Sequence, residues 1–319
     1  MRILIAGGLG FLGGRLASYL YQVGHSIVIG SRHPDRVPLW LPNLEIRTLN
    51  WQSTDALETS CIDIDVIIHA SGMNSKECAS DPISALLVNG VDTARLVKAA
   101  SRTNVKKFIY LSTAHVYSSP LDGVITEQTC PKNIHPYATS HLAGEQSVLF
   151  ANQNQQLEGV VFRLSNAFGA PVHKETNCWM LLINDLCKQA IESKTLTLNN
   201  SPNQKRDYIP VTELCHITKL FCKFDKKKPL TGVFNIGTGV TRTSLSIAEI
   251  IQKQCEKNLN YKPAIKWKKD TSETNICNAF SFESKRLREE GIQCSDKYLI
   301  TEIDQLLKFC KETFDSKKV

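Results

Sequence analysis

The feature that most constrains this chain is a glycine-rich turn that follows an apolar run at the N-terminus. Residues 2–6 (RILIA) have the pattern of a buried strand, and Gly7, Gly10 and Gly13 follow it with the spacing G-x-x-G-x-x-G. Glycine suits such a turn because the chain needs positive φ there and because a pyrophosphate must approach the backbone closely. The helix that follows would offer free N–H groups and the positive end of its dipole. Any tight βα turn can use glycine, but among six predicted strands the pattern predicts dinucleotide binding.

Short apolar runs alternate with helical patterns through the first half of the chain, which is typical of βαβ units and a parallel sheet. The strands are expected at 2–6, 26–30, 45–49, 65–70, 107–111 and 160–164. Leu12, Leu16 and Leu20 repeat every four residues, and Gly24 stands where a C-cap would end that helix. Residues 84–103 and 137–152 carry similar helical patterns. We therefore predict an α/β fold with a doubly wound parallel sheet of the Rossmann type.

The alternation becomes irregular after residue 165, where Asn, Lys, Ser and Thr are frequent. We expect a dinucleotide-binding domain over residues 1–165, to which 208–239 return. A second, smaller substrate domain, built of helices and loops, is expected over 166–319, with the active site in the cleft between the two. The apolar stripe over about 299–314 predicts a final helix.

Composition narrows the class of protein. No run of about 18 apolar residues occurs, so no membrane span is expected, and the glycine-rich N-terminus is unlike a signal peptide. The 11 cysteines form no C-x-x-C pair, which argues against a disulfide framework and a structural zinc site and indicates reduced thiols in a cytoplasm. The net charge of +7 suits an anionic small ligand, and the absence of an aromatic-interleaved basic patch argues against nucleic acid. The histidines His25, His69 and His216 are not paired at ligand spacing with a carboxylate or thiol, so no metal site is expected.

The end of the second predicted strand bears on which dinucleotide is bound. NAD specificity usually rests on an Asp or Glu that binds the ribose hydroxyls there. This strand ends Gly30-Ser31-Arg32, without an acid. The hydroxyl and guanidinium would suit the extra phosphate of NADP. The alternatives are that Arg32 is a surface residue or stacks on the adenine of either cofactor. The sequence therefore favours NADP(H), with NAD(H) as the alternative.

Longer motifs extend the pattern over nearly the whole chain. They are DVIIHASG (65–72), YLSTAHVY (110–117), PYATSHLAGE (136–145), RLSNAFG (163–169), RDYIPVTEL (206–214) and FNIGTG (234–239). Asn89 and Thr93 match the outer positions of an N-V-x-G-T motif. Together these segments resemble the extended short-chain dehydrogenase/reductase family, in the NAD-dependent epimerase/dehydratase branch that acts on nucleotide sugars.

The resemblance implies roles for particular residues. Tyr137 matches the general acid/base of the family and Thr113 its hydroxyl partner, while Asn166 and Arg206 match residues that contact the phosphate region of the substrate. For Arg206 the alternative is an internal ion pair with Asp207. The resemblance also implies a homodimer through helices 84–103 and 137–152. The expected cofactor-binding residues are Gly7, Gly10, Phe11, Leu12, Gly13, Ser31, Arg32, Asn50, Ala70, Ser71, Gly72, Asn89, Tyr137 and His141. The expected substrate-binding residues are Thr113, His115, Asn166 and Arg206.

One departure from the family concerns the catalytic helix. The family pattern is Tyr-x-x-x-Lys, but this chain has Tyr137-x-x-x-His141. The lysine binds the nicotinamide ribose and lowers the tyrosine pKa, whereas an unperturbed histidine, with a pKa of ≈ 6.5, is only about a quarter charged at pH 7. Oxidising an alcohol needs tyrosinate from the start, whereas reducing a ketone needs the neutral phenol. The substitution therefore favours a keto-sugar reductase. The alternatives are an NAD-dependent epimerase that tolerates histidine and a catalytically degraded dinucleotide-binding sensor.

The residues after Thr113 narrow the chemistry further. The 4,6-dehydratases of the family carry an Asp-Glu pair at the positions of Ala114 and His115, so dehydration is not expected here. His115 is expected either to move a proton next to the keto group or to act as a polar residue that shapes the sugar pocket. His173 and Cys178 are further acid/base candidates.

Overall fold

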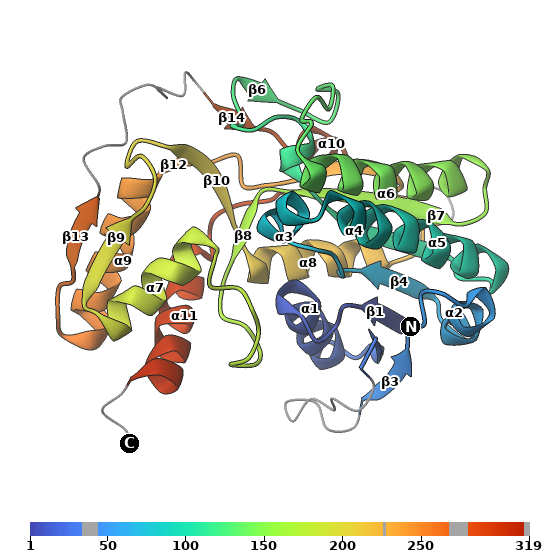
Figure 1. Ribbon diagram of the computed structural model, residues 1–319, viewed down its shortest axis with the longest axis horizontal. Helices are drawn as coiled ribbons and strands as arrows, with labels where there is room; N and C mark the ends of the chain where they lie inside the picture. Colours follow the sequence, from blue (N-terminus) through green and yellow to red (C-terminus); the bar gives the residue numbers. More distant parts are fainter. Residues whose placement is uncertain (34–43, 226–227, 268–279, 316–319) are drawn as a thin grey trace. The chain divides into compact units, whose positions relative to one another are not determined.

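The computed structural model describes residues 1–33, 44–225, 228–267 and 280–315 (Figure 1). The chain divides into two compact units. The first comprises Met1–Pro120, Thr129–Leu164 and Cys215–Asn235. The second comprises Leu121–Gln128, Ser165–Leu214 and Ile236–Val319.

A seven-stranded sheet forms the centre of the first unit. Its strand order is β11-β7-β5-β4-β1-β2-β3, and the pairs from β7 to β3 are parallel. The strands are β1 (Arg2–Ala6), β2 (Ser26–Ser31), β3 (Glu45–Thr48), β4 (Val66–His69), β5 (Lys107–Thr113), β7 (Glu158–Leu164) and β11 (Gly232–Ile236). All six predicted strands and the doubly wound fold class are confirmed. The seventh strand, β11, was not predicted.

Helices cover this sheet. They are α1 (Phe11–Gln22), α2 (Thr54–Cys61), α3 (Ser75–Ser80), α4 (Pro82–Ala85), α5 (Asp92–Arg102), α6 (Pro136–Gln153) and α8 (Val211–Cys222). Gly24 lies just beyond the end of α1 with φ of +91°, as its C-cap position predicts. Figure 1 shows α5 and α6 side by side, and the two helices are in contact.

The segment predicted as a helix over 84–103 is helical through Arg102, but it contains a π-helical turn that the sequence did not predict. A π-helical turn, Leu86–Val91, separates α4 from α5. Asn89 and Gly90 are its buried residues, and the carbonyl oxygen of Asn89 accepts hydrogen bonds from the side chains of Thr93 and Tyr110. A π-turn widens the helix and is often found at functional sites.

Both faces of the sheet are apolar, as a parallel sheet covered by helices requires. On one face Leu57 of α2, Leu96 of α5 and Val148 of α6 pack on strand residues including Phe108. Elsewhere in this unit Phe221 of α8 contacts Phe162 and Phe234, with ring centroids 4.8 Å apart in each pair. Each fully buried side chain of this kind contributes about 1.5–3 kcal/mol, so the packed faces hold the strand ends in fixed positions.

The second unit contains three small sheets as well as helices, so the prediction of helices and loops alone is corrected. Its strands are β6 (Val124–Ile125), β8 (Asn166–Phe168), β9 (Thr195–Leu198), β10 (Lys205–Pro210), β12 (Thr241–Thr243), β13 (Ala264–Trp267) and β14 (Ser281–Phe282). They pair as β12-β10-β8, β13-β9 and β14-β6. The helices are α7 (Leu182–Glu192), α9 (Ser244–Leu259), α10 (Lys285–Glu289) and α11 (Leu299–Phe314). The predicted final helix is confirmed as α11.

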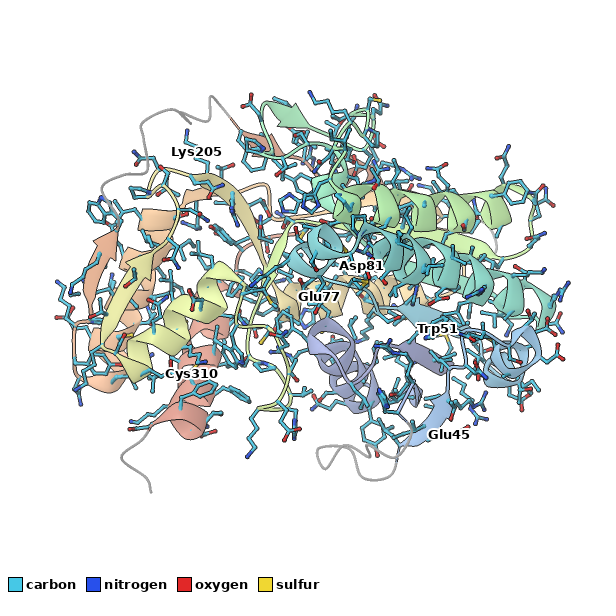
Figure 2. The ribbon with its side chains drawn as sticks, in the orientation of Figure 1. Glu45, Trp51, Glu77, Asp81, Lys205 and Cys310 are labelled. Atoms are coloured by element: carbon cyan, nitrogen blue, oxygen red, sulfur yellow. The ribbon has the colours of Figure 1, made fainter. Side chains whose placement is uncertain are left out.

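The core of the second unit lies between α7, α9 and α11. Cys187, Cys255 and Cys310 are buried in it, the last labelled in Figure 2. The ten cysteines among the described residues are free thiols, and most of them are buried. Within the same residues, no helix has both the length and the apolar content to span a membrane.

Candidate active site

The glycine loop is shaped by close backbone contacts. Gly7 has φ of +82°, and a Cβ atom there would lie 2.7 Å from the backbone nitrogen of Ser71. A Cβ atom at Gly13 would lie 2.3 Å from the carbonyl oxygen of Gly7. The following helix α1 has Gly10 at its N-cap, with no side-chain cap on the N–H groups of its first turn. Those donors and the absence of side chains make the loop suitable for a diphosphate.

One cavity lies beside this loop, and a second shares lining residues with the first. The first, of about 180 Å³, is bordered by Gly7, Ser31, Arg32 and Ser71. The other, of about 790 Å³, shares Arg32 and Trp51 with the first; Trp51 is labelled in Figure 2. Arg32 thus borders both spaces, and its cofactor role remains a prediction.

The larger cavity contains a residue that sequence reasoning missed. Asn50, a predicted cofactor residue, lines it together with Asp92 and Arg95. Arg95 donates from Nη1 to Oδ1 of Asp92 at 2.9 Å. Arg95 lies on α5, far in sequence from the glycine loop, so no local motif indicates its place in this cavity.

Asn89 connects the loop after β4 to the catalytic helix. Its Oδ1 accepts from the backbone N–H of Met73 at 2.9 Å, and its Nδ2 donates to Oγ of Ser140 on α6 at 3.0 Å. A Cβ atom at Gly72 would lie 2.9 Å from Oδ1 of Asn89 and 3.7 Å from Cε1 of His141. The loop of Ala70, Ser71 and Gly72 is therefore held against α6, close to His141.

Thr113, Tyr137 and His141 are brought together. Thr113 is the last residue of β5, and Tyr137 and His141 lie one turn apart at the start of α6. The rings of Tyr137 and His141 meet nearly at right angles, with centroids 4.6 Å apart. Burial raises the pKa of the Tyr137 phenol, and a side-chain interaction with Thr113 acts in the opposite direction. The i, i+4 spacing thus places both rings on one face of the helix.

The charge of His141 differs from the value expected for an unperturbed imidazole. The side chain is buried, and this burial lowers the pKa of His141 to about 4. At pH 7 the ring is therefore neutral, whereas an unperturbed imidazole would be about a quarter charged. The phenol of Tyr137 consequently has no cation at the position of the family lysine.

His115 follows Thr113 in a short 3-10 turn, Ala114–Val116. Its backbone N–H donates to Oγ1 of Thr113 at 3.1 Å, and its carbonyl oxygen accepts from Nδ2 of Asn133 at 2.7 Å. These bonds fix the backbone of His115 next to Thr113. They are made by the main chain, so they do not decide the role of its imidazole.

A buried ion pair joins α6 to strand β7 of the sheet. Glu145 of α6 is fully buried and binds Arg163 of β7, with Nη2 donating to Oε2 at 2.6 Å. Ser112 of β5 also donates to Glu145, and the guanidinium of Arg163 lies 4.7 Å from the ring centroid of Tyr117. The pair was not predicted as functional. Its sequence signal is a charged residue within the apolar strand VVFRL.

The predicted substrate residues of the second unit have polar partners. Nδ2 of Asn166 donates to the carbonyl oxygen of Asp207 at 2.9 Å, which ties β8 to β10. Nη2 of Arg206 donates to Oε1 of Gln204 at 3.1 Å, whereas the carboxylate of Asp207 accepts from the N–H and hydroxyl of Thr238. The described residues therefore do not contain the alternative Arg206–Asp207 ion pair.

The two further acid/base candidates differ in their surroundings. Cys178 is buried, accepts a hydrogen bond from Nδ2 of Asn184 at 3.3 Å, and has its pKa raised by burial to about 11. Its thiol therefore stays protonated near neutral pH. His173 is half-buried, and its Nδ1 accepts from the backbone N–H of Glu175 at 3.3 Å. No group of three His, Cys, Asp or Glu side chains able to hold a metal ion occurs in the part of the chain that the structure describes.

Comparison with known proteins gives the context for this site. The model of the NAD dependent epimerase/dehydratase family matches residues 3–237. A UDP-glucose 4-epimerase of Mycoplasma genitalium is 25% identical over 313 residues, covering 89% of this chain and 92% of that protein. A dTDP-glucose 4,6-dehydratase of Streptomyces niveus is 24% identical over 269 residues, covering 80% of this chain and 78% of that protein.

Solved structures have the same fold. The UDP-glucose 4-epimerase of Bifidobacterium longum, in complex with NAD⁺ and UDP, superposes with a TM-score of 0.78 at 23% identity, over 99% of each chain. This likeness extends the fold match to the full length of both proteins.

Proposed function

We propose that this chain, which belongs to the NAD-dependent epimerase/dehydratase family, is a nucleotide-sugar epimerase. The observation that carries the proposal is that the ring of Tyr137 lies 4.6 Å, between centroids, from that of His141, whose Cε1 is close to Gly72 in the loop that follows β4. The likeness to the UDP-glucose 4-epimerase of Mycoplasma genitalium, which covers 92% of that protein, supports an epimerase over the keto-sugar reductase that the sequence favours.

The residues of the chain have distinct tasks in this proposal. The glycine loop and the loop of residues 70–72 would hold a nicotinamide dinucleotide, which when bound takes up a hydride from the sugar and returns it. Oη of Tyr137 accepts the proton of the sugar hydroxyl during oxidation and gives it back during reduction. The hydroxyl of Thr113 orients the reacting oxygen, and His141 donates a hydrogen bond to the nicotinamide ribose.

Loss of water from the sugar is not part of the proposal. A 4,6-dehydratase needs carboxyl groups at the positions of Ala114 and His115 to remove and return protons, and neither residue supplies one. His115 is assigned to the lining of the sugar pocket. Asn166 and Arg206 are assigned to the phosphates of the substrate, because a guanidinium pairs with two oxygens at once.

A keto-sugar reductase is the second candidate. It is favoured by the neutral state of His141 and by the raised pKa of Tyr137, because a phenol that keeps its proton is the form that reduction uses. In an epimerase the oxidised nicotinamide would bring its own positive charge near the phenol, which acts in the same direction as the missing lysine.

The cofactor is proposed to be NADP(H), with NAD(H) as the alternative. Arg32 lines the larger cavity and no acid stands at the end of β2, whereas Arg95 in the same cavity is already paired with Asp92, so Arg32 is the guanidinium assigned to the phosphate. A phosphate on the adenosine ribose would gain a charge-assisted hydrogen bond from a guanidinium, whereas an Asp or Glu would repel it.

A homodimer through α5 and α6 is proposed as the assembly. Large apolar side chains are exposed on α4, the π-turn and α6, namely Ile83, Leu86, Leu87 and Phe150. Contact with a second copy would remove this surface from water, at about 25 cal/mol per Å². Sedimentation of the purified protein tests the assembly.

The function is tested by incubating the protein with a panel of UDP-, GDP- and dTDP-hexoses and their 4-keto derivatives, with NAD⁺, NADP⁺ or NADPH added in separate reactions, and following the sugars by NMR. Interconversion of sugar isomers without net use of NADPH is expected. Use of NADPH with a 4-keto sugar would instead support the reductase. Failure to transform any sugar, by a protein that still binds the dinucleotide, would contradict both enzymes and support the sensor. Tyr137→Phe, which removes only the phenolic hydroxyl, is the matched control.

A further inference from the structure

Tyr110, which no part of the proposed function uses, lies directly behind His141. It is a buried residue of β5, and its Oη lies 2.8 Å from Nδ1 of His141. It also donates toward the carbonyl oxygen of Asn89, at 3.3 Å. A tyrosine hydroxyl has one proton, so only one of these two groups can receive it at a time.

The distances favour His141 as the acceptor. A good O–H···O bond has a length near 2.7–2.8 Å, and 3.3 Å exceeds the usual range. The carbonyl oxygen of Asn89 also receives the hydroxyl of Thr93 at 2.7 Å, which satisfies one of its lone pairs. The proton of Tyr110 therefore lies on the bond to Nδ1. In a neutral imidazole that accepts at Nδ1, the ring proton is on Nε2.

The surroundings keep Tyr110 in its place and in its protonated form. Its ring stacks on that of His69, with centroids 5.5 Å apart. A Cβ atom at residue 144 of α6 would lie 2.8 Å from Oη of Tyr110, so Gly144 provides the space for the hydroxyl. Burial raises the pKa of Tyr110 well above its usual value, so the hydroxyl stays a donor at every physiological pH.

A second histidine, His69, belongs to a neighbouring series of hydrogen bonds between uncharged groups. Because Thr93 gives its proton to Asn89, Nε2 of His69 donates to Oγ1 of Thr93 at 3.0 Å. Nδ1 of His69 then accepts from Oγ of Ser71, at 3.1 Å. Burial lowers the pKa of His69 to about 3, so this histidine is neutral too. This series of hydrogen bonds ends at Ser71, which borders the smaller cavity beside the glycine loop.

We propose that Tyr110 is a positioning residue that fixes His141 in the Nε2–H tautomer, so that the neutral ring presents one directed donor where the family presents a lysine ammonium. Within the described residues, no hydrogen bond reaches Nε2 of His141, so this donor is left for a ligand. The catalytic value of the arrangement rests on the proposed function, because Nε2–H would serve the ribose hydroxyl of the cofactor. The tautomer itself is a property of the protein alone.

The tautomer can be measured without activity, by long-range ¹H–¹⁵N correlation spectra of protein labelled at histidine, with the signal of His141 assigned by its loss in His141→Gln. The proposal expects the neutral Nε2–H pattern at pH 7 and its persistence down to about pH 5. Tyr110→Phe should shift the signal away from that pattern. An Nδ1–H pattern in the unaltered protein, or an unchanged pattern in Tyr110→Phe, would overturn the proposal.

A double-mutant cycle separates positioning from mere stability. Tyr110→Phe should lower kcat about tenfold, the size expected for one buried hydrogen bond, but less than twofold in a His141→Lys background. Tyr117→Phe removes a comparable buried bond, to Oδ1 of Asn235 at 2.7 Å, and should cost the same in both backgrounds without changing the tautomer. Equal effects of Tyr110→Phe in both backgrounds would contradict the proposal. If the tautomer is found but no nucleotide sugar reacts, the proposed function fails and the positioning of His141 stands.

Discussion

Restoring the family lysine by His141→Lys should move the pH dependence of the reaction by a calculable amount. An ammonium at the place of the imidazole ring would lie about 4.6 Å from the centre of the Tyr137 ring. With ~4.6 Å taken as the separation between the ammonium and the phenolate charge, the two interact by ~0.9 kcal/mol at a dielectric constant of 80 and by ~3.6 kcal/mol at 20. At about 1.36 kcal/mol per pKa unit, the pKa of Tyr137 should fall by about 0.7 to 2.6 units.

The sign of the effect follows from the proton that the reaction needs. Oxidation of the sugar uses tyrosinate, so activity is lost as pH falls through the pKa of Tyr137 in the complex. A cation stabilises tyrosinate, and the acid limb of kcat should therefore move to lower pH in His141→Lys. Because burial lowers the pKa of His141 to about 4, the wild-type profile should show no inflection near pH 6.5.

The assay is the initial rate of sugar interconversion between pH 5 and 10, with kcat and KM determined separately. His141→Gln is the matched control, because it keeps a neutral donor at this position and should leave the acid limb within about 0.3 pH units. An acid limb that stays in place in His141→Lys would refute the electrostatic argument. A wild-type limb near pH 6.5 that disappears in His141→Gln would refute the neutral imidazole.

Three further substitutions test other parts of the structure. Gly7→Ala should weaken dinucleotide binding at least about tenfold in a calorimetric titration, because its Cβ atom would lie 2.7 Å from the backbone nitrogen of Ser71. Gly291→Ala is the control: Gly291 also has a positive φ, +69°, but no heavy atom lies within 4 Å of the added Cβ. It brings only backbone strain of about 1 kcal/mol and should leave binding unchanged. Glu145→Gln leaves the charge of Arg163 buried without its partner and should lower the free energy of unfolding by about 3 kcal/mol in a denaturant titration. Glu58→Gln, in the exposed pair with Arg102, should cost less than about 1 kcal/mol. Equal losses in the two variants would contradict the role given to the buried pair. Arg32→Ala should reduce the ratio of the affinity for NADP⁺ to that for NAD⁺ about tenfold or more, whereas Arg102→Ala should leave this ratio unchanged. An unchanged ratio in Arg32→Ala would show that Arg32 does not bind the phosphate.

Most strands of the first half were predictable because they are compact apolar runs, and its helices because their apolar residues recur every three or four positions. β11 was not identified as a strand, because its segment GVFNI lies after residue 165, where strands and helices no longer alternate regularly along the sequence. The π-turn at Leu86–Val91 was hidden for a different reason. Its residues have helical spacing, and the widening accompanies hydrogen bonds that Asn89 receives from Thr93 and Tyr110.

The candidate site was predictable where its residues share one helix or one strand end. Tyr137 and His141 are four residues apart, so their common face follows from helical geometry. The neutral charge of His141 was not predictable, because it depends on burial against residues distant in sequence. The same is true of Arg95, which reaches the cavity of Arg32 only through the fold.

The most direct test of the account is the fate of deuterium in a nucleotide sugar labelled at the carbinol carbon, compared between the wild-type protein and Tyr137→Phe. The account predicts that the wild-type protein forms the epimer with deuterium kept at that carbon and with no net change in the cofactor. Tyr137→Phe should bind the dinucleotide normally but react about 10²–10⁴-fold more slowly. Turnover by Tyr137→Phe at the wild-type rate, or exchange of the label with solvent hydrogen, would contradict the claim that Tyr137 moves the proton while hydride is transferred.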